Sequence, residues 1–123
     1  MKIMKVEILG VTLEAALLNP KVAHRFEDGI KEVINIAKKS SECESSAQGI
    51  EMQCNAVINF IDNIFGSDSA KKILGDETDL LTCLDAWGEL MDVYATQVNP
   101  LLEEYRDRAL ERYQKMQAMK NAG

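Results

Sequence analysis

The feature that most constrains this chain is a pair of glycines, Gly66 and Gly75, each of which directly follows an apolar helical stretch. Glycine is the usual residue just past a helix C-terminus, because it reaches positive φ without a steric penalty from a Cβ atom. The polar run 67–69 between the glycines offers three residues that can each cap a new helix. The segment 67–75 therefore predicts a short helical elbow between two longer helices. The apolar residues available to pack at this bend are Ile64, Phe65, Ile73 and Leu74.

The size and composition of the chain predict one soluble globular protein. Its 123 residues, 46% hydrophobic and 28% charged, fit a single domain that can bury an ordinary core. No apolar run approaches the roughly 20 residues that a membrane-spanning helix needs. The N-terminal apolar run 8–13 is preceded by Glu7 and broken by Gly10, which argues against a signal peptide. We therefore expect a cytoplasmic protein without a membrane partner.

Charge is unevenly distributed along the chain. Residues 41–98 carry two basic and eleven acidic side chains, whereas the whole chain has a net charge of −6. An acidic middle argues against nucleic-acid binding, which needs clustered Lys and Arg. It either attracts a basic partner or forms a solvated face that keeps the protein soluble.

The N-terminal third predicts a β-hairpin and one helix. Residues 3–9 roughly alternate, and residues 11–17 can return as a second strand after Gly10. The pair Asn19-Pro20 then resembles a helix N-cap followed by proline in the first turn. One face of the expected helix carries apolar residues at spacings of three and four, namely Val22, Phe26, Ile30, Val33 and Ala37.

Two further amphipathic helices lie on either side of the elbow. The first is expected to begin near 45–48 and to run to Phe65, with a buried stripe of Ile50, Cys54, Val57, Ile61 and Ile64. After the elbow, Thr78 or Asp79 can cap the next helix. Its expected apolar residues are Leu80, Leu81, Leu84, Trp87, Met91, Tyr94 and Val98.

The last helix is expected to start at Asn99-Pro100, and it interleaves charges of both signs with a narrow apolar stripe. It either pairs with another subunit or packs back on the domain. We therefore predict a mainly α fold: a short N-terminal β-hairpin, then a bundle of about four helices with an elbow at 67–75. The expected division is a helical domain over 1–98 and a C-terminal mixed-charge helix over 99–123.

Catalytic patterns are sparse, and we expect neither an enzyme nor a bound cofactor or metal. The three cysteines lack the spacing of a zinc site or a disulfide framework, and His24 is the only histidine. All-α nucleotide pyrophosphohydrolases bind magnesium through one Glu-x-x-Glu pair and one Glu-x-x-Asp pair. Glu89 and Asp92 match the second pair, but no Glu-x-x-Glu precedes them.

The helix order and several motifs resemble the small tail assembly chaperones of long-tailed bacteriophages and of prophages of Gram-positive bacteria. The resemblance covers about residues 3–95. It rests on Asn59-Phe60-Ile61-Asp62-Asn63-Ile64-Phe65-Gly66, on Lys72-Ile73-Leu74-Gly75, and on Asp79-Leu80 with Ala86-Trp87. The mixed-charge helix over 99–123 has no such signature.

The resemblance implies a protein that binds the long helical tape measure protein and keeps it soluble during tail assembly in the bacterial host cell. It also implies self-association into a homo-oligomer. Amphipathic helices can offer an apolar groove to a partner helix. The candidate partner-binding residues are Phe65, Ile73, Leu74, Trp87 and Met91. Each of them could instead be a core residue, and the alternative function is a self-assembling structural or regulatory helical module.

Overall fold

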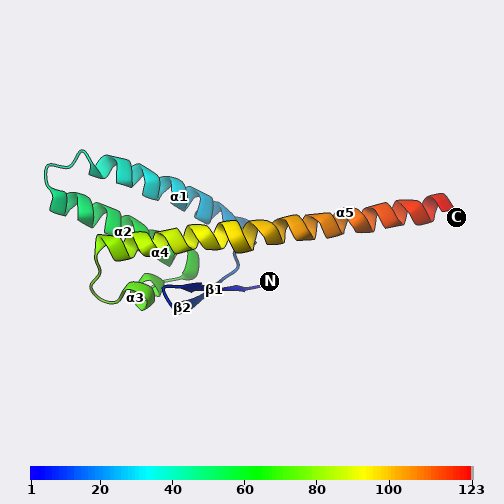
Figure 1. The fold of residues 1–123 in the computed structure, drawn as a ribbon, viewed down its shortest axis with the longest axis horizontal. Helices are drawn as coiled ribbons and strands as arrows, with labels where there is room; N and C mark the ends of the chain where they lie inside the picture. The colour runs from blue at the N-terminus through cyan, green and yellow to red at the C-terminus, as the bar shows by residue number, and fades with distance from the viewer. Residues whose placement is uncertain (123) are drawn as a thin grey trace. The chain divides into compact units, whose positions relative to one another are not determined.

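The computed structural model describes residues 1–122 and is mainly α-helical, with an N-terminal β-hairpin ahead of the helices (Figure 1). The predicted fold class is therefore confirmed. The chain divides into two compact units, residues 1–90 and 91–123, and their boundary lies inside a helix. The elements are β1 (Met4–Ile8), β2 (Val11–Ala15), α1 (Pro20–Ser40), α2 (Ser46–Phe65), α3 (Ser69–Leu74), α4 (Leu80–Val93), the π-helical segment η1 (Tyr94–Val98) and α5 (Asn99–Ala122).

The hairpin of β1 and β2 is closed by a two-residue turn. The strands are antiparallel, with Val6 opposite Leu13. Leu9 and Gly10 both have positive φ, +48° and +80°, as the central residues of a type I′ turn require. The second strand ends at Ala15, two residues earlier than the sequence predicts. One face of the hairpin is buried, formed by Val6, Ile8, Leu13 and Ala15.

Helix α1 begins at the predicted cap and packs along α2, beside which it lies in Figure 1. The side chain of Asn19 accepts hydrogen bonds from the backbone N–H groups of Lys21 and Val22. A Cβ atom added at Gly29 would lie only 2.4 Å from Cδ2 of Phe60 on α2. The glycine therefore allows the two helices to approach closely. This contact provides a packing reason for a glycine in the middle of a helix.

Helix α2 begins where the sequence predicts, because the hydroxyl of Ser45 accepts a hydrogen bond from the N–H of Gln48. The predicted stripe is correct in the second half of the helix but wrong at its start. Ile50 is 45% exposed, whereas the buried residues other than Gly49 lie in the second half of the helix. These residues are Ala56, Val57, Phe60, Ile61 and Ile64.

Helix α4 leaves some of its predicted apolar residues exposed. The side chains of Leu81 and Leu84 are 74% and 41% exposed. The buried residues of α4 lie on the opposite face, where Cys83 and Ala86 stand beside Leu90. The buried residues of α4 are Cys83, Ala86, Leu90 and Val93.

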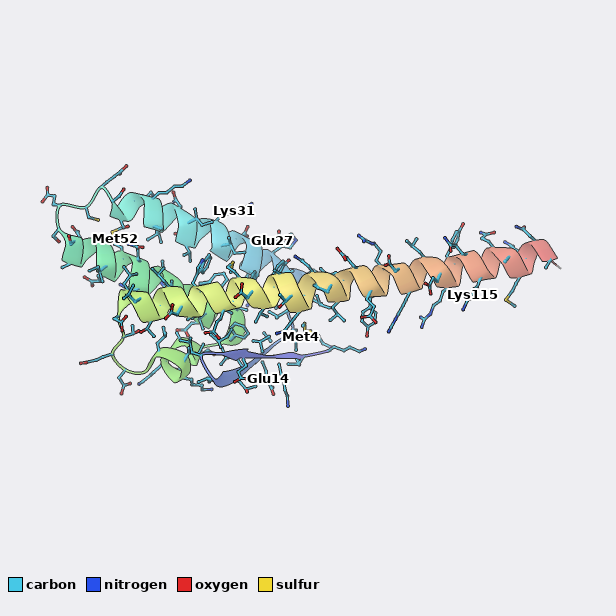
Figure 2. The ribbon with its side chains drawn as sticks, in the orientation of Figure 1. Met4, Glu14, Glu27, Lys31, Met52 and Lys115 are labelled. Atoms are coloured by element: carbon cyan, nitrogen blue, oxygen red, sulfur yellow. The ribbon has the colours of Figure 1, made fainter. Side chains whose placement is uncertain are left out.

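In the second unit, α5 begins at Asn99, as predicted, but it continues the preceding helix without a break. Asn99 has helical φ and ψ angles, and helical residues run unbroken from α4 through η1 into α5. A proline inside a helix lacks an N–H donor, and its ring crowds the carbonyl four residues before it. The wider π-helical turn directly before Pro100 absorbs this crowding. None of the residues of α5 is buried, and Figure 2 labels Lys115 on this helix.

Candidate functional site at the helical elbow

The elbow consists of α3 and the two glycines that bound it. Gly66 ends α2 with φ +107° and donates its N–H to the carbonyl of Asp62. Gly75 ends α3 with φ +82° and donates to the carbonyl of Lys71 over 2.8 Å. Residues other than glycine rarely adopt these φ values, so both bends depend on glycine. The predicted elbow is therefore present at the predicted place.

The start of α3 is capped by a residue that the sequence does not single out. Asp68 stands at the N-cap position, but it has φ +66° and its side chain makes no capping hydrogen bond. Instead, Oδ1 of Asp62 in the preceding helix accepts a hydrogen bond from the N–H of Ala70 over 2.9 Å. Asp62 thus binds the last turn of α2 to the first turn of α3 and sets the angle of the bend.

A depression of about 300 Å³ lies at the elbow. Its apolar floor includes Ile58 from α2 and Leu74 from α3. Its rim is polar, and an ion pair of 3.0 Å joins Nζ of Lys71 to the carboxylate of Asp76. The remaining lining residues are Asp62, Asp68, Ala70, Gly75 and Thr78. Three carboxylates around one lysine make this rim acidic.

The five predicted partner-binding residues lie in different environments. Leu74 is buried and lines the depression, and Ile73 beside it is half-buried. Phe65 and Met91 are also half-buried. The indole of Trp87 packs edge-on against the ring of Phe60, with centroids 5.1 Å apart.

Phe60 also contacts the ring of Phe26 in an edge-on arrangement, with centroids 5.2 Å apart. Phe60, which lies on α2, thus contacts one aromatic residue of α1 and one of α4. Trp87 therefore contributes to the interior of the first unit, where edge-on aromatic pairs add to the stability from buried area.

Sequence reasoning missed Ile58, Asp62, Lys71 and Thr78 as lining residues of the depression. A signal was present for Asp62, which lies four residues before Gly66 and eight before Ala70. Where the chain turns sharply after a helix, a carboxylate in the last turn of that helix can accept hydrogen bonds from the free N–H groups at the start of the next helix. Sequence spacing does not show which side chains surround the bend, because that depends on the packing of α2, α3 and the hairpin.

Two titrating groups near the elbow have shifted pKa values. Asp79 caps α4, and hydrogen bonds from the backbone N–H and the hydroxyl of Thr82 lower the pKa of its carboxyl. Burial raises the pKa of the Cys83 thiol to about 11. A thiol with such a pKa is protonated and unreactive at neutral pH.

The pyrophosphohydrolase alternative rests on Glu89 and Asp92, and the carboxylate of Glu89 contacts the hairpin turn. Oε1 of Glu89 accepts a hydrogen bond from the backbone N–H of Leu9 over 3.1 Å. Within residues 1–122, no group of three or more His, Cys, Asp or Glu side chains is arranged to hold a metal ion.

A comparison with protein families matches residues 9–123 to a family described as "Family of unknown function (DUF6673)". The chain belongs to this family. The match includes α1 to α5, so the mixed-charge C-terminal helix is part of what the family shares. Comparisons with curated proteins and with solved structures found no match. None of the helices in residues 1–122 is both long enough and apolar enough to cross a membrane.

Proposed function

We propose that this chain is a phage tail assembly chaperone that binds a long helical tape measure protein and keeps it soluble in the cytoplasm of the bacterial host. The observation that carries the proposal is the elbow. The two glycine-ended segments on which the family resemblance rests form one continuous bend, from α2 through α3 to the start of α4.

The chemistry of the elbow supports a helical client. The depression offers an apolar floor of Ile58 and Leu74, and its rim carries an excess of carboxylates. An amphipathic helix places apolar side chains at spacings of three and four into such a groove. The acidic rim favours a client helix with basic residues beside its apolar stripe, since opposite charges steer association.

Co-expression with the longest open reading frame in the same gene neighbourhood tests this proposal. The expected result is that the long protein becomes soluble and co-elutes with this chain in pull-down and sizing experiments. The proposal fails if the long protein stays insoluble while this chain is folded and abundant.

A matched pair of variants tests the role of the elbow. Ile73→Ser removes a half-buried apolar side chain there, while Ile34→Ser removes an exposed isoleucine from α1. We expect Ile73→Ser to reduce recovery of the soluble client about tenfold and Ile34→Ser to leave it unchanged. Circular dichroism checks that both variants fold. Equal recovery with the two variants would place the client elsewhere on the chain.

The alternative, a self-assembling module without chaperone activity, draws support from α5. This helix has no buried residue and exposes Leu102, Leu110, Met116 and Met119. Under this alternative, the chain forms a stable oligomer by itself and remains in the final particle, whereas a chaperone leaves.

A further inference from the structure

The outer face of α4 exposes apolar residues that the first unit does not cover. Leu81 is 74% exposed and Leu84 is 41% exposed. One turn further on, Gly88 has helical geometry, and a Cβ atom added there would meet no heavy atom within 4 Å. A glycine inside a helix costs about 1 kcal/mol relative to alanine. Unlike Gly29, Gly88 has no packing role within the chain, and it leaves room on this face for the close approach of another helix.

This face is also acidic. Residues 75–93, which comprise α4 and the segment before it, contain six Asp or Glu and no Lys or Arg. Asp85 is exposed between Leu84 and Gly88, and Glu77 and Asp79 are exposed just before the helix. An occupant of the α4 face therefore has to bring apolar side chains together with positive charge.

Helix α5 has the complementary pattern. At 3.6 residues per turn, one stripe of α5 contains five exposed residues within about 40° of a common line. These residues are Leu102, Tyr105, Ala109, Tyr113 and Met116. Tyrosine, methionine and arginine are the side chains that protein interfaces favour.

Basic residues border this stripe, and acidic residues lie behind it. Arg106 and Arg112 lie about 60° to either side of the stripe. Lys120 lies on the line of the stripe, one turn beyond Met116. Within residues 1–122, none of these three takes part in an ion pair. The four carboxylates of α5 lie about 120° or more from the stripe, at Glu103, Glu104, Asp107 and Glu111.

This arrangement disfavours pairing of α5 with α5 of a second copy. Residues beside the apolar seam face each other across a helix pair, so like charges there repel. In a parallel or an antiparallel pair, the stripe of one copy would bring its arginines toward those of the other. The favoured occupant is a surface with leucines and carboxylates, which is what the α4 face offers.

We propose that the apolar stripe of α5 in one copy docks on the Leu81–Leu84–Gly88 face of α4 in a second copy. The arginines of α5 then lie beside Asp85 and its acidic neighbours. The contact joins two different surfaces, so it can be made reciprocally in a two-fold dimer or repeated from copy to copy in a ring or an open chain. This inference goes beyond the proposed function and uses none of the residues that line the elbow depression.

Two double variants of the full chain test the contact. Arg106→Glu with Arg112→Glu reverses the sign of the charge on both sides of the α5 stripe. Asp85→Lys reverses the sign of a charge on the α4 face, and Gly88→Lys places a long side chain where the glycine leaves open space. The charge-matched control for the α5 variant is Lys31→Glu with Lys38→Glu on α1, where both lysines are exposed. Circular dichroism checks the fold of each protein.

Sedimentation equilibrium measures the assembly. We expect the unmodified chain and the α1 control to associate with increasing concentration, and to dissociate between about 0.05 M and about 0.5 M salt. Each double variant should associate at least about tenfold more weakly. An equimolar mixture of the two variants should associate more tightly than either variant alone, because the intact α5 of one variant can dock on the intact α4 face of the other.

The proposal is overturned if the unmodified chain stays monomeric at every concentration, or if the mixture of variants does not pair. It is also overturned if only the α5 variant dissociates, since α5 would then meet some other surface. Binding of the monomeric chain to vesicles of anionic phospholipid or to a DNA duplex, with loss in the α5 variant, would assign the stripe to that ligand instead.

Discussion

The carboxylate of Glu89 on α4 accepts a hydrogen bond from the backbone N–H of Leu9, a residue of the hairpin turn eighty positions earlier in the chain. Leu9 has a positive φ, which is uncommon for a leucine. The hydrogen bond helps to hold the turn in this conformation and fixes the hairpin to the second half of α4, the helix that follows the elbow.

Replacement of Glu89 by alanine should therefore destabilise the first unit. Hydrogen bonds to charged groups contribute about 1.5–3 kcal/mol when partly shielded. We expect Glu89→Ala to lower the free energy of unfolding by about 1–2 kcal/mol, and Glu89→Gln, which keeps an acceptor oxygen, to lower it less. Urea denaturation measures both values. A loss of magnesium-dependent nucleotide hydrolysis in a fully stable Glu89→Gln variant would instead favour the pyrophosphohydrolase alternative.

The two glycines in helices α1 and α4 should respond oppositely to alanine. At Gly29 the added methyl group would overlap the buried ring of Phe60, and overpacking costs about 1–3 kcal/mol. At Gly88 the methyl group enters open space, so the gain in helix propensity of about 1 kcal/mol remains. Thermal unfolding of dilute protein should show a lower Tm for Gly29→Ala and a higher Tm for Gly88→Ala. A similar shift of both in one direction would contradict the packing described for α1 and α2.

Local signals in the sequence predicted much of the fold. Asn19 and Ser45 cap their helices, and Gly66 and Gly75 end theirs, because each of these roles depends only on neighbouring backbone groups. The hairpin also followed from alternation around Gly10.

The sequence was a poorer guide where packing between distant elements decides the outcome. Leu81 is more apolar than Cys83 or Ala86, yet Leu81 is exposed and the two smaller residues are buried. Likewise, Asp62 and not Asp68 caps α3, since the bend brings the end of α2 to the new helix. The candidate site at the elbow was therefore located correctly along the chain, but most of its lining residues were not identified.

The Cys83 thiol should be the least reactive of the three. It is fully buried and its pKa is raised to about 11, whereas Cys43 and Cys54 are half-buried. A disulfide reagent at pH 8 should modify Cys83 only after unfolding, and mass spectrometry of the labelled peptides identifies the site. Rapid labelling of Cys83 in the native protein would contradict its burial.

The same thiol makes stability sensitive to alkaline pH. Its folded pKa lies above the unfolded value of about 8.5, so the unfolded state loses the proton first. The contribution is therefore fully present below about pH 8.5 and is lost as the pH rises toward about 11. Denaturant midpoints over this range should fall more steeply for the unmodified chain than for Cys83→Ala.

Asp79 should give the opposite dependence at acidic pH. Hydrogen bonds from Thr82 lower the pKa of its carboxyl in the folded state, so the unfolded state takes up a proton first as the pH falls. The stabilisation is present above the unfolded pKa of about 3.9 and is lost as the pH drops through the folded value.

Asp79→Asn keeps an acceptor for the N–H of Thr82 without a titrating group, whereas Asp79→Ala removes the cap. We expect a lower Tm at neutral pH for Asp79→Ala, and for Asp79→Asn a Tm that depends less on pH between 3 and 5 than that of the unmodified chain. Identical acid profiles for Asp79→Asn and the unmodified chain would show that the cap does not contribute to the pH dependence of folding.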